Sequence, residues 1–577
     1  MSQTAHGAAG RAAFRWSLPT LAATAALALS GSEAGAQITI PNNVKATCTV
    51  SATEFNGWFQ SGTVTLNGIV DPADGLLFQA TSLCNFYKWS EQMFLWLTSP
   101  APPRYGQATH VFSSPVFYSV SPEVNGVRTL IPNTPGGLFN FRPFISQLGK
   151  LGKPVVVDST GKKHTVIRAE VAPGGKAIAR SANRALEIGR VELAPNNKPI
   201  LRDKAGAVIA NPVLRDRAGK TIKIAGAIRV NGHPMLIDPA GNAIETEEGQ
   251  AGGGGVLMAQ GGTCQNGQIV YYLLQVNDVW AYFLTGVKNN QISATQFPST
   301  SAQISAVGTY AMTNGIKDKS IPDLPAMAIE LKSAWIDVSA VANPSDYITI
   351  DATIPTYTTA CPSQWNQTGQ KSAKLALLGF HVVGTVLGHP EMLWATFEHI
   401  SNTANAAYSY TDTSNQTQNV AQNTNGTFLF TPNGATTGLN PPPFMAVSGT
   451  GITATSQNNN TIGPTPLLRA APWGTLASSG AFTGNNTDII SLNNSVISKL
   501  APGDARAKYV HTGTVWTPGG QNPSNGNFAG ATGMANTTME SFFQGGLQCF
   551  DCHSDPPMLG SGGGGLSHIY GTAQKLF

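Results

Sequence analysis

The sequence predicts an α+β fold: a strand-rich body, interrupted by an inserted β-hairpin module, with a helical segment near the C-terminus. The chain has 577 residues, of which 41% are hydrophobic and 11% charged, which is enough for several packed units. One stretch has the three- and four-residue hydrophobic spacing of an amphipathic helix, and several others are short runs of β-formers. Four copies of a strand-and-turn pattern gather in one basic segment.

Residues 1–36 have the order of charged, apolar and small residues that is typical of a secretory signal peptide. Arg11 and Arg15 precede a mostly apolar run over 18–29, and small residues follow up to Ala36. About 12 apolar residues fall short of the roughly 20 that span a membrane. We therefore expect Sec-type export, cleavage after Ala36, no transmembrane segment in the mature chain and a periplasmic or extracellular location.

Four of the six cysteines precede the last 30 residues: Cys48, Cys84, Cys264 and Cys361. Thiols tend to pair in an oxidising compartment, and four cysteines allow three connectivities. We predict that nearest neighbours pair, Cys48 with Cys84 and Cys264 with Cys361, because each pair lies on one side of the basic segment. Buried thiols are the alternative.

Residues 37–149 are expected to form the N-terminal part of the body, with short strands such as 62–66 and one helix over 83–97. The helical stretch reads LCNFYKWSEQMFLWL and repeats its large apolar residues at helical spacing. Its aromatic residues could line a cofactor pocket, but core packing is the better interpretation.

Residues 150–255 are predicted to form the inserted basic module. Between Lys150 and Pro234 there are 17 Lys and Arg against 6 Asp and Glu, whereas the net charge of the whole chain is +4. Four segments place apolar β-formers before Asp-x-x-Gly, with the Asp at 158, 203, 216 and 238. Asp can bond its own backbone and Gly can adopt positive φ, so each segment predicts a strand entering a tight hairpin turn.

Residues 256–400 are expected to form the central part of the body, with strands and adjoining helix at 267–285 and 326–338. The next segment, 401–467, is rich in Asn and Thr and nearly uncharged, which predicts long surface loops or short strands. Residues 468–577 form the predicted C-terminal segment, with helices over 485–500 and 534–544.

The C-terminal segment contains Cys549-Phe550-Asp551-Cys552-His553, which is the C-x-x-C-H pattern of c-type haem attachment. Two thiols three positions apart can each bond one vinyl group on the same porphyrin edge, and the following histidine can bind the iron. Predicted export agrees, because such haem is attached outside the cytoplasm. A zinc site or a redox dithiol is the alternative. Only 24 residues follow His553, so we expect upstream chain to enclose the haem.

His568 is the leading candidate for the sixth iron ligand, because glycines at 562–565 could let the chain reach the opposite face of the haem. Met558 is closer to the motif and is stiffened by two prolines. Histidines of the body are further candidates: His381, His389, His399 and His511.

Several short segments resemble those of large, secreted, single-haem cytochrome c family proteins of bacteria. The resemblance rests on NFYKWSEQMFLWL at 85–97, IELKSAW at 329–335, GFHVVGTVLGHPEMLWATFEH at 379–399, YVHTGTVW at 509–516, NTTMESFFQ at 536–544, and the terminal CFDCH and SHIY. It covers most of the chain outside the basic module and the Asn/Thr-rich segment. It implies haem binding through Cys549, Cys552 and His553 and electron transfer, without a defined substrate.

The leading functional hypothesis is therefore an exported electron-transfer cytochrome with one covalent haem c. A haem enzyme of the peroxidase or oxygenase type is the second, with Glu398 or one of His381, His389 and His399 as distal acid or base. A surface protein with structural haem is the third, and it rests on the β module and the Asn-rich loops.

The absence of other known motifs argues against several further classes of function. The sequence has no phosphate-binding P-loop, no nucleophile elbow and no zinc-protease helix. An exported protein rarely meets nucleic acid, so we expect no nucleic-acid ligand. The basic module therefore predicts an acidic redox partner protein or an anionic surface as its docking partner, with a solvated surface as the alternative.

Overall fold

The computed structural model describes residues 36–577 with some internal segments excepted. The exceptions are 124–126, 144–154, 159, 161, 171–176, 182–183, 197, 204, 217–218, 231–232, 247–254, 262–267, 317–319, 359–362, 424–425, 433–439, 441–442, 449, 456–457, 476–482, 524–526, 542–548, 554–558 and 560–565. The predicted signal peptide up to residue 35 lies outside the described residues, as do Cys264, Cys361 and Met558. No helix among the described residues is long and apolar enough to cross a bilayer.

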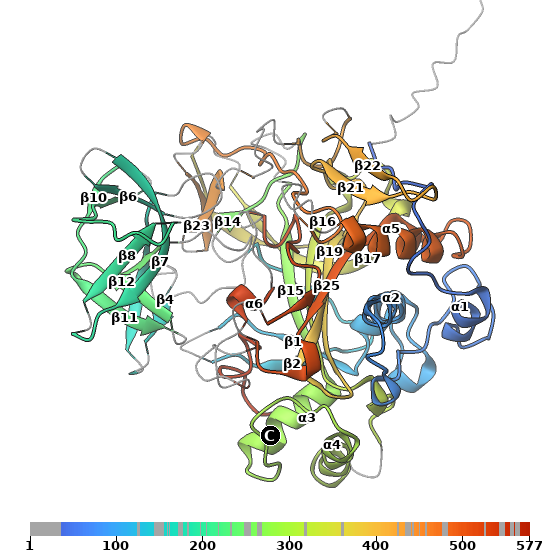
Figure 1. The fold of residues 1–577 in the computed structure, drawn as a ribbon. Helices are drawn as coiled ribbons and strands as arrows, with labels where there is room; N and C mark the ends of the chain where they lie inside the picture. Colours follow the sequence, from blue (N-terminus) through green and yellow to red (C-terminus); the bar gives the residue numbers. More distant parts are fainter. Residues whose placement is uncertain are drawn as a thin grey trace, which may run out of the picture. The chain divides into compact units, whose positions relative to one another are not determined.

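The structure is strand-rich and mixed α+β, as the sequence predicts, and is organised around a ten-stranded sheet (Figure 1). The main path of the sheet runs β2 (Leu130–Pro132), β1 (Phe117–Val120), β15 (Tyr271–Asn277), β16 (Ile329–Asp337), β19 (Gln367–Val386), β20 (His389–His399), β25 (Tyr509–Trp516) and β26 (Ala529–Gly530). Off this path, β17 (Thr349–Tyr357) pairs with β19 and with β3 (Phe139–Asn140). Neighbouring strands are antiparallel except β17 and β3.

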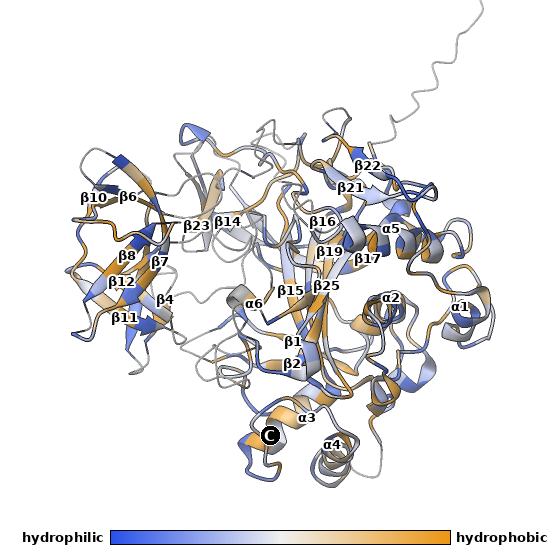
Figure 2. Ribbon diagram, viewed as in Figure 1, coloured by the Kyte–Doolittle hydropathy of each residue, from blue (hydrophilic) through white to orange (hydrophobic). Residues whose placement is uncertain are grey.

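Helices cover both faces of this sheet. On one face, α2 (Leu83–Thr98) and α5 (Thr483–Ile497) share a hydrophobic core with β16, β19 and β20. On the other face, α3 (Asp278–Lys288) and α4 (Ser301–Asn314) belong to a second core that includes Trp394. Hydrophobic residues, orange in Figure 2, follow the central strands. The α2 face and the α3 face are therefore two separate apolar environments.

Local chemistry explains where these helices begin. The side chain of Asn277 accepts a hydrogen bond from the Trp280 backbone and so caps α3 directly after strand β15. Thr300 and Gln303 form a capping box at the start of α4. The predicted helix over 83–97 matches α2, and its aromatic residues pack in the core as expected. The remaining α-helix of the N-terminal part is α1 (Ala52–Trp58).

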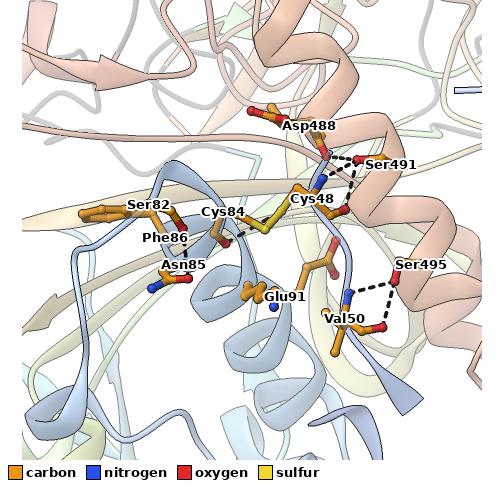
Figure 3. Close-up of a disulfide and its surroundings, with 12 residues drawn as sticks. Cys48, Val50, Ser82, Cys84, Asn85, Phe86, Glu91, Asp488, Ser491 and Ser495 are labelled. Carbon is orange, nitrogen blue, oxygen red and sulfur yellow. Dashed lines mark hydrogen bonds between the residues drawn. A yellow bond between two sulfur atoms is a disulfide. The ribbon is translucent and has the colours of Figure 1, made fainter. Parts of the chain in front are cut away.

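A disulfide joins Cys48 to Cys84 at the start of α2, with the two Cα atoms 5.4 Å apart (Figure 3). This confirms the predicted pairing, whereas the predicted Cys264–Cys361 bond lies outside the described residues. The same segment is tied to α5, because the Cys48 backbone bonds Ser491 Oγ through both its N–H and its carbonyl. Val50 makes the same two bonds with Ser495. The disulfide and the serines thus fix the N-terminal segment between two helices.

The insert has strands and an apolar cluster of its own. A five-stranded sheet contains β11 (Gly226–Val230), β12 (His233–Ile237), β13 (Ala243–Glu245), β5 (Lys163–Arg168) and β4 (Val155–Val157). A three-stranded sheet contains β6 (Ile178–Ser181), β7 (Arg184–Leu193) and β8 (Pro199–Asp203), and β9 (Leu214–Arg215) pairs with β10 (Thr221–Ile222). The buried residues of the cluster all come from 169–244. The insert therefore has a small core distinct from those of the sheet.

The predicted Asp-x-x-Gly turns are present in the insert. At Asp216 and Asp238, the Asp carboxylate accepts the N–H four residues later, and the N–H of Gly219 or Gly241 bonds the Asp carbonyl. These glycines have φ of 82° and 79°, as the turn requires. Asp203 makes the same turn with Gly206, and Asp158 makes the carboxylate bond. The sequence pattern therefore predicted a backbone geometry correctly.

The Asn/Thr-rich segment contains β21 (Tyr408–Thr411), β22 (Thr417–Val420), β23 (Met445–Ser448) and β24 (Gly451–Ala454). The last two pair with β14 (Gly255–Val256) and β18 (Gln364–Trp365). Short strands were predicted, but the location at the surface is wrong in part, because residues 402–404 are completely buried. Some of their polar groups are bonded inside the protein: the Asn402 amide donates to the Leu378 carbonyl and the Thr403 hydroxyl to the Leu467 carbonyl, whereas Asn402 Oδ1 has no partner among the described residues.

Two other predicted elements are wrong. Residues 62–66 are a loop instead of a strand, and Leu66 is 54% exposed. In the predicted helix over 534–544, described residues 534–541 form a single turn, started by hydrogen bonds from Thr538 and Glu540 to Asn536. Beyond α5, the α-helix that the structure describes is α6 (Cys549–Cys552), one turn long. A helical C-terminal segment is therefore not confirmed.

Short 3-10 turns complete the described secondary structure. They lie at Gly75–Leu77, Pro103–Tyr105, Val111–Ser113, Leu324–Ala326, Val338–Ala340, Pro344–Asp346, Ala505–Lys508 and Pro518–Gly520.

Candidate functional site

The α3 face of the central sheet receives the C-terminal segment. Antiparallel register aligns two rows of side chains across β16, β19 and β20: Lys332, His381 and Thr396 in one, and Glu330, Val383 and Trp394 in the other. Because residues two apart on a strand share a face, both rows lie on the same face. Trp394 packs in one hydrophobic cluster with Phe550 and Leu566. The sheet thus forms a partly polar floor beneath the C-x-x-C-H segment.

The C-x-x-C-H segment forms the helical turn α6. The His553 N–H bonds the Cys549 carbonyl at 3.0 Å, so the turn extends to the histidine. In such a turn, residues three and four apart lie on neighbouring positions of one face. Cys549 is half-buried against the α3-face core. The local backbone therefore suits two attachment points followed by a ligand.

His553 is held in one tautomer by the backbone. Its Nδ1 lies 2.7 Å from the Leu566 carbonyl oxygen, which can only accept, so Nδ1 carries the proton. Burial, followed by the neighbouring His568, lowers the pKa of His553 well below its usual value, so the ring is neutral. The lone pair is therefore on Nε2. Histidines that bind metals typically donate their other ring nitrogen to a carbonyl in this way.

Aromatic side chains surround the histidine. The centroid of the Trp394 ring is 4.2 Å from that of His553 at an interplanar angle of 43°. Phe550 meets Trp394 edge-on at 6.1 Å. These rings give His553 an apolar wall, which limits access of water to a bound group.

His568 also reaches His553. The two imidazole rings stack face to face, with centroids 3.9 Å apart and an interplanar angle of 14°. If His553 and His568 were both to hold a haem iron, the two stacked rings would have to separate. The fold brings the two predicted ligands together, and ligation of iron by His568 stays a prediction.

A charged cluster lies on the same face. His381 Nε2 is 2.9 Å and Lys332 Nζ is 3.2 Å from the carboxylate of Glu540. Burial would raise the pKa of Glu540, but attraction to His381 and Lys332 outweighs it and holds the pKa well below its usual range. His381 was a sequence candidate, whereas Lys332 and Glu540 were missed. Only the alternation of I-E-L-K on β16 indicated that Lys332 shares a face with other polar residues.

The remaining candidate histidines lie elsewhere. His389 and His511 contact Phe86 and Phe397, which belong to the core on the α2 face. His399 stacks on Tyr347 at 3.7 Å. Burial lowers the pKa of both His399 and His511 to about 3, which keeps them neutral. These side chains are packed into the body on the side of the sheet opposite to Trp394.

Glu398 is committed to a buried ion pair. Its Oε2 accepts from Arg469 Nε at 3.0 Å, and both side chains are 0% exposed. Its Oε1 accepts from the Thr537 backbone at 2.7 Å. Both oxygens are thus occupied by structural contacts, and His389 is similarly bonded to Glu391 at 2.8 Å.

Comparison with known proteins identifies no relative. No family model matches the chain, and no match was found among curated proteins or solved structures. Within the described residues, no group of three or more His, Cys, Asp and Glu side chains could hold a metal ion. The resemblance to secreted cytochromes therefore stays a prediction from short motifs.

The described residues fit a covalent haem. The helical turn α6 contains both cysteine positions, three residues apart. The Nδ1–H of His553 donates to the Leu566 carbonyl, which leaves Nε2 with a lone pair for a metal ion. Trp394 and Phe550 supply apolar surface of the kind that contacts a porphyrin. Cys549, Cys552 and His553 are the residues that would hold the group.

Proposed function

We propose that the protein is an exported c-type cytochrome that binds one haem c covalently and transfers electrons in the periplasm or outside the cell. The orientation of His553 carries this proposal. Its Nδ1 donates to a backbone carbonyl on a helical turn that starts with Cys549, and this leaves Nε2 for iron. When bound, the haem supplies one-electron redox chemistry. The chain orients the ligand and excludes water.

The residues of the C-x-x-C-H motif and those around it have distinct parts in this proposal. Cys549 and Cys552 attach the porphyrin, and His553 binds the iron. The Leu566 carbonyl keeps His553 in the tautomer that can ligate. Trp394 limits the positions available to the imidazole. The cluster of Lys332, His381 and Glu540 adds charge on the same sheet face, which influences a reduction potential through electrostatics.

Covalent haem attachment is the decisive test. The protein should be expressed with its export sequence in a bacterium that matures c-type cytochromes. We expect haem that survives denaturing electrophoresis and a mass increase of one haem. Cys549→Ser with Cys552→Ser should abolish both, whereas Cys264→Ser, outside the motif, should retain them. A folded, exported wild-type protein without covalent haem would refute the proposal.

A second function, a haem-dependent redox enzyme, is favoured by one observation. His381 and Glu540 form a hydrogen-bonded pair on the sheet face that carries the haem segment. Such a pair could act as acid and base on a ligand of the iron. The other enzyme candidates, His389, His399 and Glu398, are held in structural contacts.

Optical spectra separate the two functions. A low-spin ferric spectrum that cyanide and peroxide leave unchanged indicates a six-coordinate electron carrier, whereas a high-spin spectrum that responds to them indicates an enzyme. If His568 is the sixth ligand, His568→Ala should convert low spin to high spin. An unchanged spectrum in that variant would exclude His568. His381→Asn should leave the wild-type spin state unchanged.

We also propose that the basic insert docks an acidic redox partner protein. Internal ion pairs, such as Arg180 with Glu170 and Arg202 with Glu192, neutralise only part of its positive charge. Opposite charges accelerate such encounters and make them sensitive to salt. Replacing Lys198 and Lys220 by Glu should slow electron exchange with an acidic partner at low salt. Rates that do not depend on salt would contradict docking by charge.

A further inference from the structure

His164 on β5 lies inside the insert, where its side chain is only 2% exposed. The strand β5 pairs with β4 on one side and with β13 on the other. The two ring nitrogens reach Asp158, directly after β4, and Gly241, in the turn between β12 and β13. Because Gly241 is 77 positions away from His164 in the sequence, the ring joins segments that only the fold brings together.

Both ring nitrogens face atoms that accept hydrogen bonds. Nδ1 lies 2.7 Å from the Gly241 carbonyl oxygen, and Nε2 lies 2.8 Å from Oδ2 of Asp158. A carbonyl oxygen and a carboxylate oxygen cannot donate, and a neutral imidazole carries a single N–H. A neutral ring would therefore set its lone pair against that of an oxygen in one of the two contacts. A ring with a proton on each nitrogen donates to both.

The Asp158 carboxylate is held in its ionised form. Its Oδ1 accepts from the backbone N–H groups of Thr160 at 2.9 Å and Lys162 at 3.0 Å, and from the Thr160 hydroxyl at 2.6 Å. Hydrogen bonds from Thr160, and then from His164, hold the pKa of Asp158 well below its usual range. The proton between Nε2 and Oδ2 therefore belongs to the imidazole, and the contact is a charge-assisted hydrogen bond.

Other charged groups lie on the elements around the ring. Asp238, in the turn between β12 and β13, accepts from the N–H groups of Ala240 and Asn242 and from the Asn242 side chain, so its carboxylate is bonded within its own turn. Further charged or titratable residues on these elements are Lys162, Lys163, Arg168, His233 and Glu245. Among the described residues, Asp158 is the carboxylate that bonds the ring.

We propose that protonated His164 is a pH-sensitive clamp that ties the chain after β4 to the turn between β12 and β13. The charge of histidine ordinarily changes between about pH 5 and 8. The clamp is complete at the acidic end of that range, and one of its two bonds is lost as the ring gives up a proton towards the alkaline end. Lys162 and Lys163 are exposed next to it, so release changes the basic surface of the insert. The clamp depends neither on haem attachment nor on a docked partner.

Hydrogen exchange on the full mature chain tests the clamp. The reporters are the backbone N–H groups of Lys162 and Asn242, which bond the carboxylates of Asp158 and Asp238 at its two ends. In the wild type, the protection factor of at least one reporter, corrected for the intrinsic effect of pH on exchange, should fall about tenfold between about pH 5.5 and 8, because one charged hydrogen bond is lost. His233→Gln, which changes a histidine of the same module outside the clamp, should show the same fall.

Asp158→Asn separates the clamp from a merely structural contact. The Asn oxygen can accept from Thr160 and Lys162 while its amide donates to Nε2 of a neutral ring. Both contacts then survive at either pH, so the protection factors should no longer change with pH. His164→Gln removes the titrating ring and should also abolish the pH dependence, with lower protection throughout. A wild type with constant protection, or either of these two variants responding to pH as strongly as the wild type, would overturn the proposal.

Discussion

Arg469 shows how single buried residues join distant parts of this protein. Its guanidinium bonds Glu398, the Asn405 side chain and the His399 carbonyl. Through Glu398 the network reaches the Thr537 backbone, at the turn that also carries Glu540. The position of Glu540 beside Lys332 therefore depends on the ion pair between Glu398 on β20 and Arg469.

Removing one member of the Arg469–Glu398 ion pair should lower the free energy of unfolding. Arg469→Met leaves a buried carboxylate without its partner, and we expect a loss of about 3–5 kcal/mol in the free energy of unfolding. Lys374→Met is the control, because the Lys374 and Asp351 side chains are 55% and 67% exposed and such pairs contribute at most about 1 kcal/mol. Chemical denaturation measures both. Equal losses in the two variants would contradict the structural role of Arg469.

A residue could be predicted from the sequence when the residues that define its role are close to it along the chain. Cys549, Cys552 and His553 form a recognisable motif because they are close together in the sequence, and covalent haem attachment at these residues stays a proposal. The contacts of His553 with Trp394 and of Lys332 with Glu540 join residues more than 150 positions apart. No local pattern could indicate these contacts, because strand order and register create them.

At the level of elements, the Asp-x-x-Gly turns test how backbone conformation limits sequence. The same turn recurs outside the insert at Asp412, where Asn415 has a φ of 60° in place of glycine. Asn tolerates this left-handed conformation better than other residues with side chains. The turn therefore requires a positive φ at its fourth residue, and either Gly or Asn can adopt it.

This difference can be measured at Gly241. It has a φ of 79°, and a Cβ atom added to it would meet no neighbouring atom, so Gly241→Ala should cost about 1–2 kcal/mol through backbone strain alone. Gly241→Asn should cost less. Gly226→Ala is the control, since Gly226 has no positive φ and only ordinary contacts with Ile237. In thermal unfolding, we expect the largest loss of stability for Gly241→Ala, a smaller loss for Gly241→Asn and the smallest for Gly226→Ala. Equal losses for the two Gly241 variants would contradict this explanation.

The disulfide is a second testable element. Cys48 and Cys84 close a loop with a sequence separation of 36 residues, so removing the bond should cost about 3–4 kcal/mol by raising the entropy of the unfolded chain. Cys48→Ala with Cys84→Ala tests this by chemical denaturation. Ser491→Ala, which removes one tie between the same segment and α5, should cost less. A double cysteine variant as stable as the wild type would show that α5 alone holds the segment.

For the elements, prediction succeeded where side-chain pattern and backbone agree. The helix α2 has a continuous apolar face, and the Asp-x-x-Gly turns carry their own hydrogen-bond partners. Residues 62–66 have β-forming side chains but find no neighbouring strand among the described residues, so the prediction of a strand there is wrong. A strand depends on a partner that its own sequence does not specify.

For the whole molecule, buried carboxyl groups and buried histidines make the stability depend on pH in opposite directions. Burial raises the pKa of three carboxyl groups, Glu91 to about 8 and Asp278 and Glu330 to about 7. Burial lowers the pKa of three histidines, His110 to about 4 and His399 and His511 to about 3. The folded protein prefers all six in the neutral form, so charging any of them favours unfolding.

Two substitutions separate these effects. A Glu91 carboxyl with a raised pKa contributes stability that is present below its unfolded pKa of about 4.3 and is lost as pH rises towards 8. His399, with a lowered pKa, contributes stability that is present above about pH 6.5 and is lost as pH falls towards 3. Relative to Glu91→Gln, the wild type should lose about 1.4 kcal/mol per unit rise in pH between about 5 and 6.5.

Relative to His399→Gln, the wild type should instead lose about the same amount per unit fall in pH over that range. Guanidinium unfolding at several pH values measures both differences. Slopes of the same sign in the two comparisons would contradict the assigned protonation states.

The local chemistry of this protein could be read along the chain: the C-x-x-C-H motif, the helix at 83–97, the turns of the insert and the Cys48–Cys84 pair. Each depends on residues near in sequence or on a few compatible pairings. Tertiary structure decided the rest: that His553 lies against Trp394, that Lys332, His381 and Glu540 meet, and that His164 reaches the Gly241 carbonyl. Side-chain neighbours across a sheet follow from strand order and register, and these are set by the packing of the whole chain.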